Sequence, residues 1–261
     1  MTQLSLRGIG VLVTRPAHQA EPLIALLEAA GARVILFPTL QITPIPLTPA
    51  LLMARIEAAD IITFISANAV YYAQQLLTDN DWVAAKQIAA VGKRTALALN
   101  DIGWSADILP DKHFNSESLL ACHQMQEVVD QRILIIRGEG GRETLASTLR
   151  ERGADVDYAE VYRREIPDAD IELLLEVWRQ GEIHVTTITS NSALENLMTM
   201  LGDDARRFIQ QMPLAVFSQR QAYLARQVGC EADIIVATNA TNEAMVEATR
   251  LALLPSDQVI H

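Results

Sequence analysis

The sequence predicts an α/β protein built from two similar domains, each with a small parallel sheet covered by helices. Short apolar runs typical of buried strands alternate along the chain with segments of helical periodicity. An apolar strand running into a Ser/Asn cluster occurs twice, at Ser66 and at Ser190, which lie 124 positions apart. Residues 38–46 and 160–167 contain or end in proline, which indicates two extended connectors. We therefore expect an internal duplication, two connector strands and a ligand cleft between the domains.

Composition argues against several classes of function. The 261 residues can form one large or two ordinary domains, and half of them are apolar. The net charge of −11 argues against broad nucleic-acid or anionic-membrane binding, which needs a basic surface. The N-terminus lacks the apolar core of a signal peptide, and no apolar run approaches the roughly 20 residues that span a bilayer. We expect a cytoplasmic protein that binds neither nucleic acid nor membrane, with Cys122 and Cys230 as reduced thiols.

Elements of the first half follow from its apolar runs and its glycines. Continuous apolar runs predict strands at 9–13, 34–37, 61–65, 88–91 and 108–110. Pro16 suits the first turn of a helix that follows the first strand and ends at Gly31. Further helices are expected at about 49–58, around 70–77, from Gly92 to Gly103, and around 119–125.

The second half repeats this order. Strands are expected at 133–136, 156–158, 185–189, 214–217 and 234–236. Helices are expected around 145–153, at 171–178, after 190, before 229 and at about 242–253. Spacing supports a duplication, because Arg15 precedes Gly31 by 16 residues, as Arg137 precedes Gly153. The two repeats span about 9–110 and 132–240.

Several short segments, in order along the whole chain, resemble the uroporphyrinogen-III synthase family of tetrapyrrole biosynthesis. They are VLVTRP at 11–16, FP at 37–38, FISANAV at 64–70, AVGKRTA at 90–96, RGEGGR at 137–142, GADV at 153–156, VYR at 161–163 and TSNS at 189–192. The resemblance implies two α/β domains, with the chain leaving and re-entering the first. On this basis we expect domain 1 at 1–37 and 168–254, domain 2 at 43–160, connectors at 38–42 and 161–167, and a tail at 255–261.

The resemblance also implies a function. The expected enzyme is a monomeric lyase of heme biosynthesis that cyclises hydroxymethylbilane to uroporphyrinogen III. The reaction inverts the last pyrrole ring, loses water and passes through a spirocyclic intermediate, with no cofactor or metal. A transient contact with the preceding pathway enzyme is also expected. A non-catalytic, two-lobed protein that binds small anions or regulates is the alternative, since paired α/β lobes often do only that.

Site residues follow from the same resemblance. Tyr162 matches the family's tyrosine and is the candidate proton donor, with domain packing as the alternative role. Helix N-termini and arginines are expected to bind the eight substrate carboxylates, although N-capping or solvated surface charge would also explain these residues. The substrate-binding candidates are Arg15, Ser66, Asn68, Thr95, Arg137, Gly138, Thr189, Ser190, Ser192 and Ser218.

One position departs from the family pattern. The family commonly has a threonine in the second repeat at the position that matches Thr95, and this chain has Gln221 there. Ser218 likewise stands where glycine is usual. Either the threonine is dispensable or its role has passed to a neighbouring residue.

Overall fold

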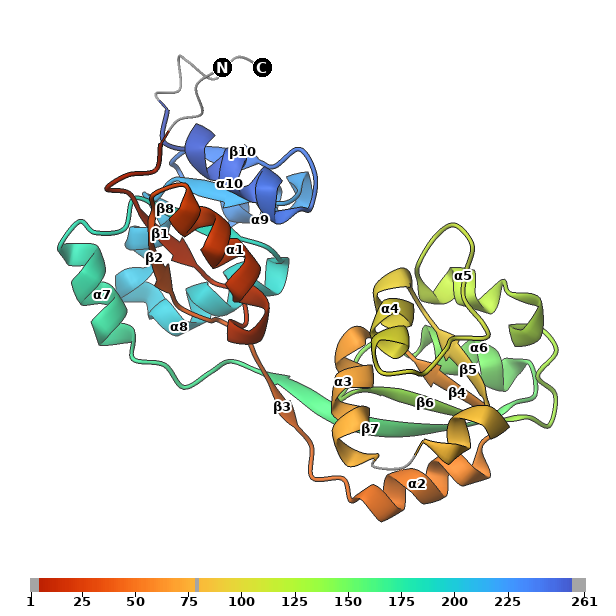
Figure 1. The fold of residues 1–261 in the computed structure, drawn as a ribbon. Coiled ribbons are helices and arrows are strands. Elements are labelled where there is room, and N and C mark those ends of the chain that lie inside the picture. Colours follow the sequence, from red (N-terminus) through yellow and green to blue (C-terminus); the bar gives the residue numbers. More distant parts are fainter. Residues whose placement is uncertain (1–4, 78–79, 255–261) are drawn as a thin grey trace. The chain divides into compact units, whose positions relative to one another are not determined.

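The computed structural model describes residues 5–77 and 80–254 (Figure 1). The tail predicted at 255–261 lies outside the described residues. The chain divides into two compact units: the first runs up to Gln41 and resumes at Glu165, and the second spans Ile42–Arg164. Among the described residues, no helix has the length and apolar character that crossing a bilayer requires. The predicted α/β class with two sheets is confirmed.

The first unit contains a five-stranded sheet with the order β10-β9-β8-β1-β2. Its strands are β1 (Gly10–Val13), β2 (Arg33–Leu36), β8 (Val185–Ile188), β9 (Leu214–Val216) and β10 (Ile234–Val236). All four neighbouring pairs are parallel. β1 and β8 are buried along their whole length, as expected for parallel strands with helices on both faces.

Helices cover both faces of this sheet. One face packs against α1 (Ala17–Ala29) and α10 (Asn242–Leu251), with Val11 and Val13 in the same apolar cluster. The other packs against α7 (Ile171–Arg179), α8 (Asn191–Gln210) and α9 (Gln219–Gln227), with Leu12 in that cluster. Successive residues of a strand therefore pack into two separate apolar cores, because side chains alternate between the two faces of a sheet.

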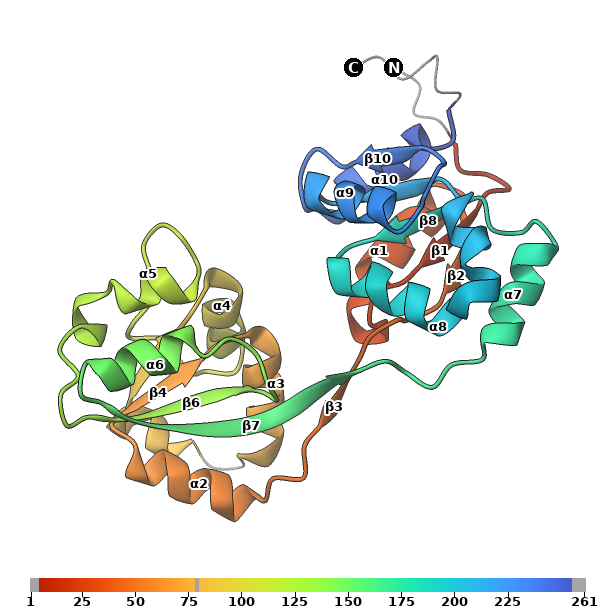
Figure 2. The same ribbon diagram turned by 180° about the vertical axis from the view of Figure 1, so that it is seen from behind.

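The second unit contains a five-stranded sheet with the order β3-β7-β6-β4-β5. Its strands are β3 (Gln41–Pro44), β4 (Ile61–Phe64), β5 (Gln87–Ala90), β6 (Arg132–Gly138) and β7 (Asp155–Glu165). The core on one face includes residues of α2 (Pro49–Ala58), α3 (Ala67–Leu76) and α4 (Lys93–Asp101). The other face packs against α5 (Ser116–Leu120) and α6 (Thr144–Glu151), as Figure 2 shows from behind.

Four neighbouring strands of one sheet correspond to four of the other once the duplication is taken into account, and β10 and β3 are the outer strands outside this match. The first repeat supplies β1 and β2 to one sheet and β3, β4 and β5 to the other. The second repeat supplies β6 and β7 to the second sheet, and β8, β9 and β10 to the first. The colours of Figure 1 show this division, because the red and blue ends of the chain share one unit. Each unit thus combines the start of one repeat with the end of the other.

Three predicted elements differ from the structure. The strand expected at 108–110 is an isolated bridge between Ile108 and Ala89, so it extends the sheet by one residue only. The strand at 156–158 and the following connector form one strand, β7, because its ladder with β6 continues past a register shift at Arg137/Gly138. The helix expected around 119–125 ends at Leu120, and a short 3₁₀ turn covers His123–Met125.

Two buried threonines at equivalent strand positions differ in the hydrogen bonding of their hydroxyl groups. Thr63 in β4 and Thr187 in β8 are both fully buried. Thr187 Oγ1 donates to the Leu12 carbonyl at 3.2 Å, whereas Thr63 Oγ1 has no hydrogen-bond partner among the described residues. A buried hydroxyl without a partner costs about 1–3 kcal/mol, and a typical hydrogen bond contributes about 1 kcal/mol.

We therefore expect Thr63→Val to raise the free energy of unfolding by about 1 kcal/mol. Thr187→Val should lower it by a similar amount, because the Leu12 carbonyl loses a donor. Urea denaturation with an unchanged m-value is the measurement. Shifts of the same sign in both variants would contradict this account.

Candidate functional site

In the first unit, the predicted site residues follow the strands of the sheet. Arg15 follows β1, Ser190 follows β8 and Ser218 follows β9. Because the strands are parallel, their carboxyl ends meet at the same edge of the sheet, where ligands bind in such folds. Both serines are N-caps: Ser190 Oγ accepts the Ala193 N–H at 3.1 Å, and Ser218 Oγ accepts the Gln221 N–H at 3.4 Å.

Hydroxyl groups gather at the start of α8. Ser190 Oγ lies 3.2 Å from Ser192 Oγ, and the half-buried Thr189 directly precedes them. Ser192 is exposed in the first turn of the helix. The partial positive charge of a helix N-terminus attracts anions, and hydroxyls can donate to them. This turn therefore has the groups needed to bind a carboxylate.

Arg15 is held at the same edge by the last helix. Its Nη1 donates to Asn242 Oδ1 at 2.7 Å, and its guanidinium carbon lies 5.8 Å from the centre of the Phe217 ring. Asn242 is the first residue of α10, whose N-cap is Thr241. Sequence reasoning missed Asn242, although the Thr-Asn pair that begins this helix after the last strand was a usable signal.

The structure gives a physical reason for the Gln221 departure. Gln221 is 7% exposed, and its Oε1 accepts the Phe217 N–H at 2.7 Å. The matching Thr95, 4% exposed, lies in the first turn of α4, whose N-cap Gly92 has no side chain to cap it. Gln221 thus serves the backbone at the end of β9, and Ser218 supplies the cap that Gly92 cannot.

In the second unit, the predicted proton donor Tyr162 lies in β7 and is only 3% exposed. Its hydroxyl oxygen is 3.1 Å from Ser66 Oγ, and Ser66 also caps α3 by accepting the Ala69 N–H at 3.1 Å. The Tyr72 ring stacks on Tyr162 with 5.7 Å between ring centres. Sequence reasoning missed Tyr72, because no local pattern links residues in a helix and a strand so far apart.

Glycine at position 138 is required by this arrangement. A Cβ atom there would overlap the Tyr162 ring. Near the same sheet edge, Asn68 is half-buried in the first turn of α3. The side chains of Tyr162, Ser66 and Asn68 can donate and accept hydrogen bonds. Within residues 5–77 and 80–254, no three His, Cys, Asp or Glu side chains gather as metal ligands do.

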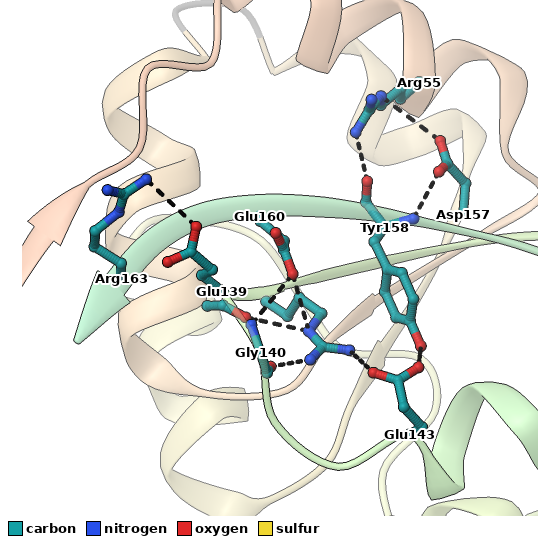
Figure 3. Close-up of polar contacts among 10 residues, drawn as sticks. Arg55, Glu139, Gly140, Glu143, Asp157, Tyr158, Glu160 and Arg163 are labelled. Atoms are coloured by element: carbon teal, nitrogen blue, oxygen red, sulfur yellow. Dashed lines mark hydrogen bonds and ion pairs between the residues drawn. The ribbon is translucent and has the colours of Figure 1, made fainter.

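The Arg137 side chain, predicted to bind substrate, is occupied by its own loop. Figure 3 labels Gly140, Glu143 and Glu160 around it. Arg137 is 3% exposed, and its Nη1 donates to Glu143 Oε1 at 2.9 Å. Its Nε donates to the Gly138 carbonyl at 3.1 Å and lies 3.8 Å from Glu160 Oε1. Its Nη2 donates to the Gly140 carbonyl. This geometry favours a role in ordering the glycine-rich loop.

Tyr158 also contacts the Arg137 guanidinium, and its hydroxyl points toward Glu143 (Figure 3). The guanidinium carbon of Arg137 lies 4.5 Å from the centre of the Tyr158 ring, and the Tyr158 hydroxyl bonds Glu143. The hydrogen bonds from Tyr158 and Arg137 lower the pKa of Glu143. Burial, and then the bond to Glu143, raise the pKa of Tyr158. Glu143 therefore stays ionised and the phenol stays protonated at neutral pH.

The sequence is similar to a family model and to named proteins of other organisms. The family model described as uroporphyrinogen-III synthase HemD matches residues 21–247. The chain is 33% identical to the uroporphyrinogen-III synthase of Escherichia coli (strain K12) over 245 residues, covering 92% of this chain and 99% of that protein. It is 36% identical to the enzyme of the same name from Synechococcus elongatus over 212 residues, covering 78% and 79% of the two chains.

Solved structures show the same fold. A mutant uroporphyrinogen III synthase from the extremely thermophilic bacterium Thermus thermophilus has a TM-score of 0.59 at 19% identity, covering 94% of this chain and 98% of that one. The uroporphyrinogen-III synthetase of Helicobacter pylori 26695 has a TM-score of 0.56 at 15% identity, covering 92% and 97%. With the sequence matches, these findings show that the chain belongs to the uroporphyrinogen-III synthase family.

Proposed function

We propose that this protein converts hydroxymethylbilane to uroporphyrinogen III, with inversion of the last pyrrole ring and loss of water. The family match over residues 21–247 supports the reaction class, a cyclising lyase of heme biosynthesis. The observation in the structure that supports it best is the phenol of Tyr162, placed 3.1 Å from Ser66 Oγ at the end of the second sheet. A phenol there can supply the proton that the departing hydroxyl needs.

In each sheet, the polar groups that follow the carboxyl ends of the strands are the groups proposed to bind substrate carboxylates. Hydroxyls and free N–H groups at helix N-termini provide hydrogen-bond donors to the substrate's negative charge without burying a cation of their own. Arg137 contributes by ordering the loop, since its donors are engaged. The proposed binding residues are Arg15, Asn68, Thr95, Gly138, Thr189, Ser190, Ser192 and Ser218.

Tyr162 acts as the general acid in this proposal. Its phenol donates a proton to the hydroxyl of the bilane, which leaves as water and leaves a cationic azafulvene. The substituted α-carbon of the last pyrrole ring bonds to the azafulvene carbon and forms the spirocyclic intermediate. The older bond from that α-carbon to the methylene bridge of the third ring then breaks, and the free α-carbon of the last ring bonds to the released methylene carbon. This α-carbon loses its proton, which restores the phenol. No net proton is consumed, and the remaining work is to fold the bilane so that the reacting carbons meet, which is a proximity effect.

The instability of hydroxymethylbilane favours a contact between this protein and the enzyme that supplies the bilane. Hydroxymethylbilane closes spontaneously to uroporphyrinogen I, so capture soon after its release favours the III isomer. A transient contact with the enzyme that makes the bilane would shorten this interval. Both enzymes would then work in the cytoplasm.

The direct test is an assay of the purified chain with enzymatically generated hydroxymethylbilane. Uroporphyrinogen III should form at a rate proportional to the amount of protein, as analysed by isomer separation. Formation of uroporphyrinogen I alone, at the rate seen without the protein, would contradict the proposal and favour a non-catalytic anion-binding role.

Tyr162→Phe removes the phenol oxygen and keeps the ring. Turnover should fall by about 10²–10⁴-fold, the usual contribution of a general acid. The fold should persist, because the ring still packs against Tyr72. Tyr223→Phe is the matched control, because Tyr223 is exposed on α9. Equal turnover in the two variants would remove Tyr162 from the mechanism.

Arg137→Met separates an ordering role from direct substrate binding. The buried carbonyl of Gly138 would lose a donor, so the free energy of unfolding should fall by about 1–3 kcal/mol. Urea denaturation measures this change, and steady-state kinetics give KM alongside it. Unchanged stability with a raised KM would instead identify Arg137 as a substrate ligand.

A further inference from the structure

The hydroxyl of Tyr162 lies beside a side chain that already has a structural task. Ser66 Oγ is its hydrogen-bonding side-chain partner among the described residues, at 3.1 Å. The same oxygen accepts the Ala69 N–H and so caps α3. A residue that caps a helix and touches a candidate acid can affect the acid's geometry.

Packing prevents the Tyr162 ring from moving away from Ser66. On one side, Gly138 lies so close that a Cβ atom there would overlap the ring. On another, Tyr72 stacks on it with an interplanar angle of 27°. The Tyr72 hydroxyl donates to the Ile42 carbonyl of β3 at 2.6 Å, which holds the stacking ring in turn. The phenol oxygen therefore has one defined position, and Ser66 meets it there.

The hydrogen-bond capacity of Ser66 suits a phenol that gives up and regains a proton. A serine hydroxyl has one proton and two lone pairs, and the Ala69 N–H uses one lone pair. Ser66 can therefore accept from the phenol, or donate to its oxygen after the proton has left. A hydrogen bond to a charged oxygen is stronger than one between neutral groups. The N-terminus of α3 adds partial positive charge close to the same oxygen.

The equivalent serine in the first unit lacks this arrangement. Ser190 caps α8 by accepting the Ala193 N–H at 3.1 Å, as Ser66 caps α3. Its other side-chain partner is Ser192, a second hydroxyl, and not a tyrosine. Both serines therefore cap a helix. Of the two, Ser66 also contacts a buried phenol.

We propose that Ser66 is a positioning residue for the general acid: its hydroxyl orients the Tyr162 phenol and stabilises the oxygen when the proton departs. The inference rests on the proposed function, and it assigns Ser66 an effect on turnover rather than on substrate affinity. Ser66 is half-buried, whereas Tyr162 is 3% exposed.

A double-mutant cycle with Tyr162→Phe tests this inference. Ser66→Ala should lower kcat by about 10- to 100-fold, the rate equivalent of one hydrogen bond to a charged group, with KM nearly unchanged. In the Tyr162→Phe background the same change should have no further effect on kcat, because the phenol oxygen is already absent. Ser66→Thr keeps the hydroxyl and should retain most of the turnover.

Loss of the helix cap needs its own control. Thr48→Ala removes the cap of α2 in the same unit, where Thr48 Oγ1 accepts the Leu51 N–H at 3.3 Å, and kcat should not change. Ser66→Gly gives a second route, because glycine is a tolerable N-cap without a hydroxyl. It should lower kcat as Ser66→Ala does while the thermal midpoint stays close to that of the parent.

Three results would overturn the inference. If Ser66→Ala lowers kcat by the same factor with and without the Tyr162 hydroxyl, Ser66 acts independently of Tyr162. A raised KM with unchanged kcat would make Ser66 a substrate-binding residue only. If Tyr162→Phe keeps full turnover while the chain still makes uroporphyrinogen III, the acid role fails and the reaction assignment stands.

Discussion

Parallel pairing between strands of different repeats is the constraint on which the rest of the structure depends. β1 of the first repeat pairs with β8 of the second, and β6 of the second pairs with β4 of the first. Loop-closure entropy opposes both pairings, since they join residues far apart in the sequence. Once formed, they align the carboxyl ends of the strands. Arg15 and Ser190 therefore lie at the carboxyl ends of strands in the first sheet. Ser66 and Tyr162 come together in the second sheet.

Burial of Tyr162 reconciles two opposing requirements on a proton donor. A donor needs a defined position, which packing against Tyr72 and Gly138 supplies. It also needs a polar partner, because a buried hydroxyl without one costs about 1–3 kcal/mol. Ser66 meets this need and leaves the phenol able to give or accept a proton. The same hydrogen bond thus stabilises the second unit and prepares the group proposed to do the chemistry.

Much of the fold was predictable because its signals are local. Strand positions follow from continuous apolar runs, and α2 and β10 have the bounds that the sequence predicts. The caps at Ser66 and Ser190 also follow from local residue preferences. Contacts between distant segments carry no local signal. The approach of Glu160 to Arg137 and the Tyr72–Tyr162 stack could not be predicted, because they join segments that are far apart in the sequence.

Charge explains why the candidate binding groups are mostly neutral. The chain carries a net charge of −11, yet the proposed substrate is a polycarboxylate. Arg137 adds little attraction, since Glu143 and Glu160 lie at 2.9 Å and 3.8 Å from its guanidinium nitrogens. Hydroxyls and N–H groups at helix N-termini are directional, and their partial charges act only around the first turn of the helix. They can therefore bind carboxylates at chosen points without making the surface basic. A protein built in this way selects a polyanion by the placement of its helix ends, and that placement depends on the strand pairing described above.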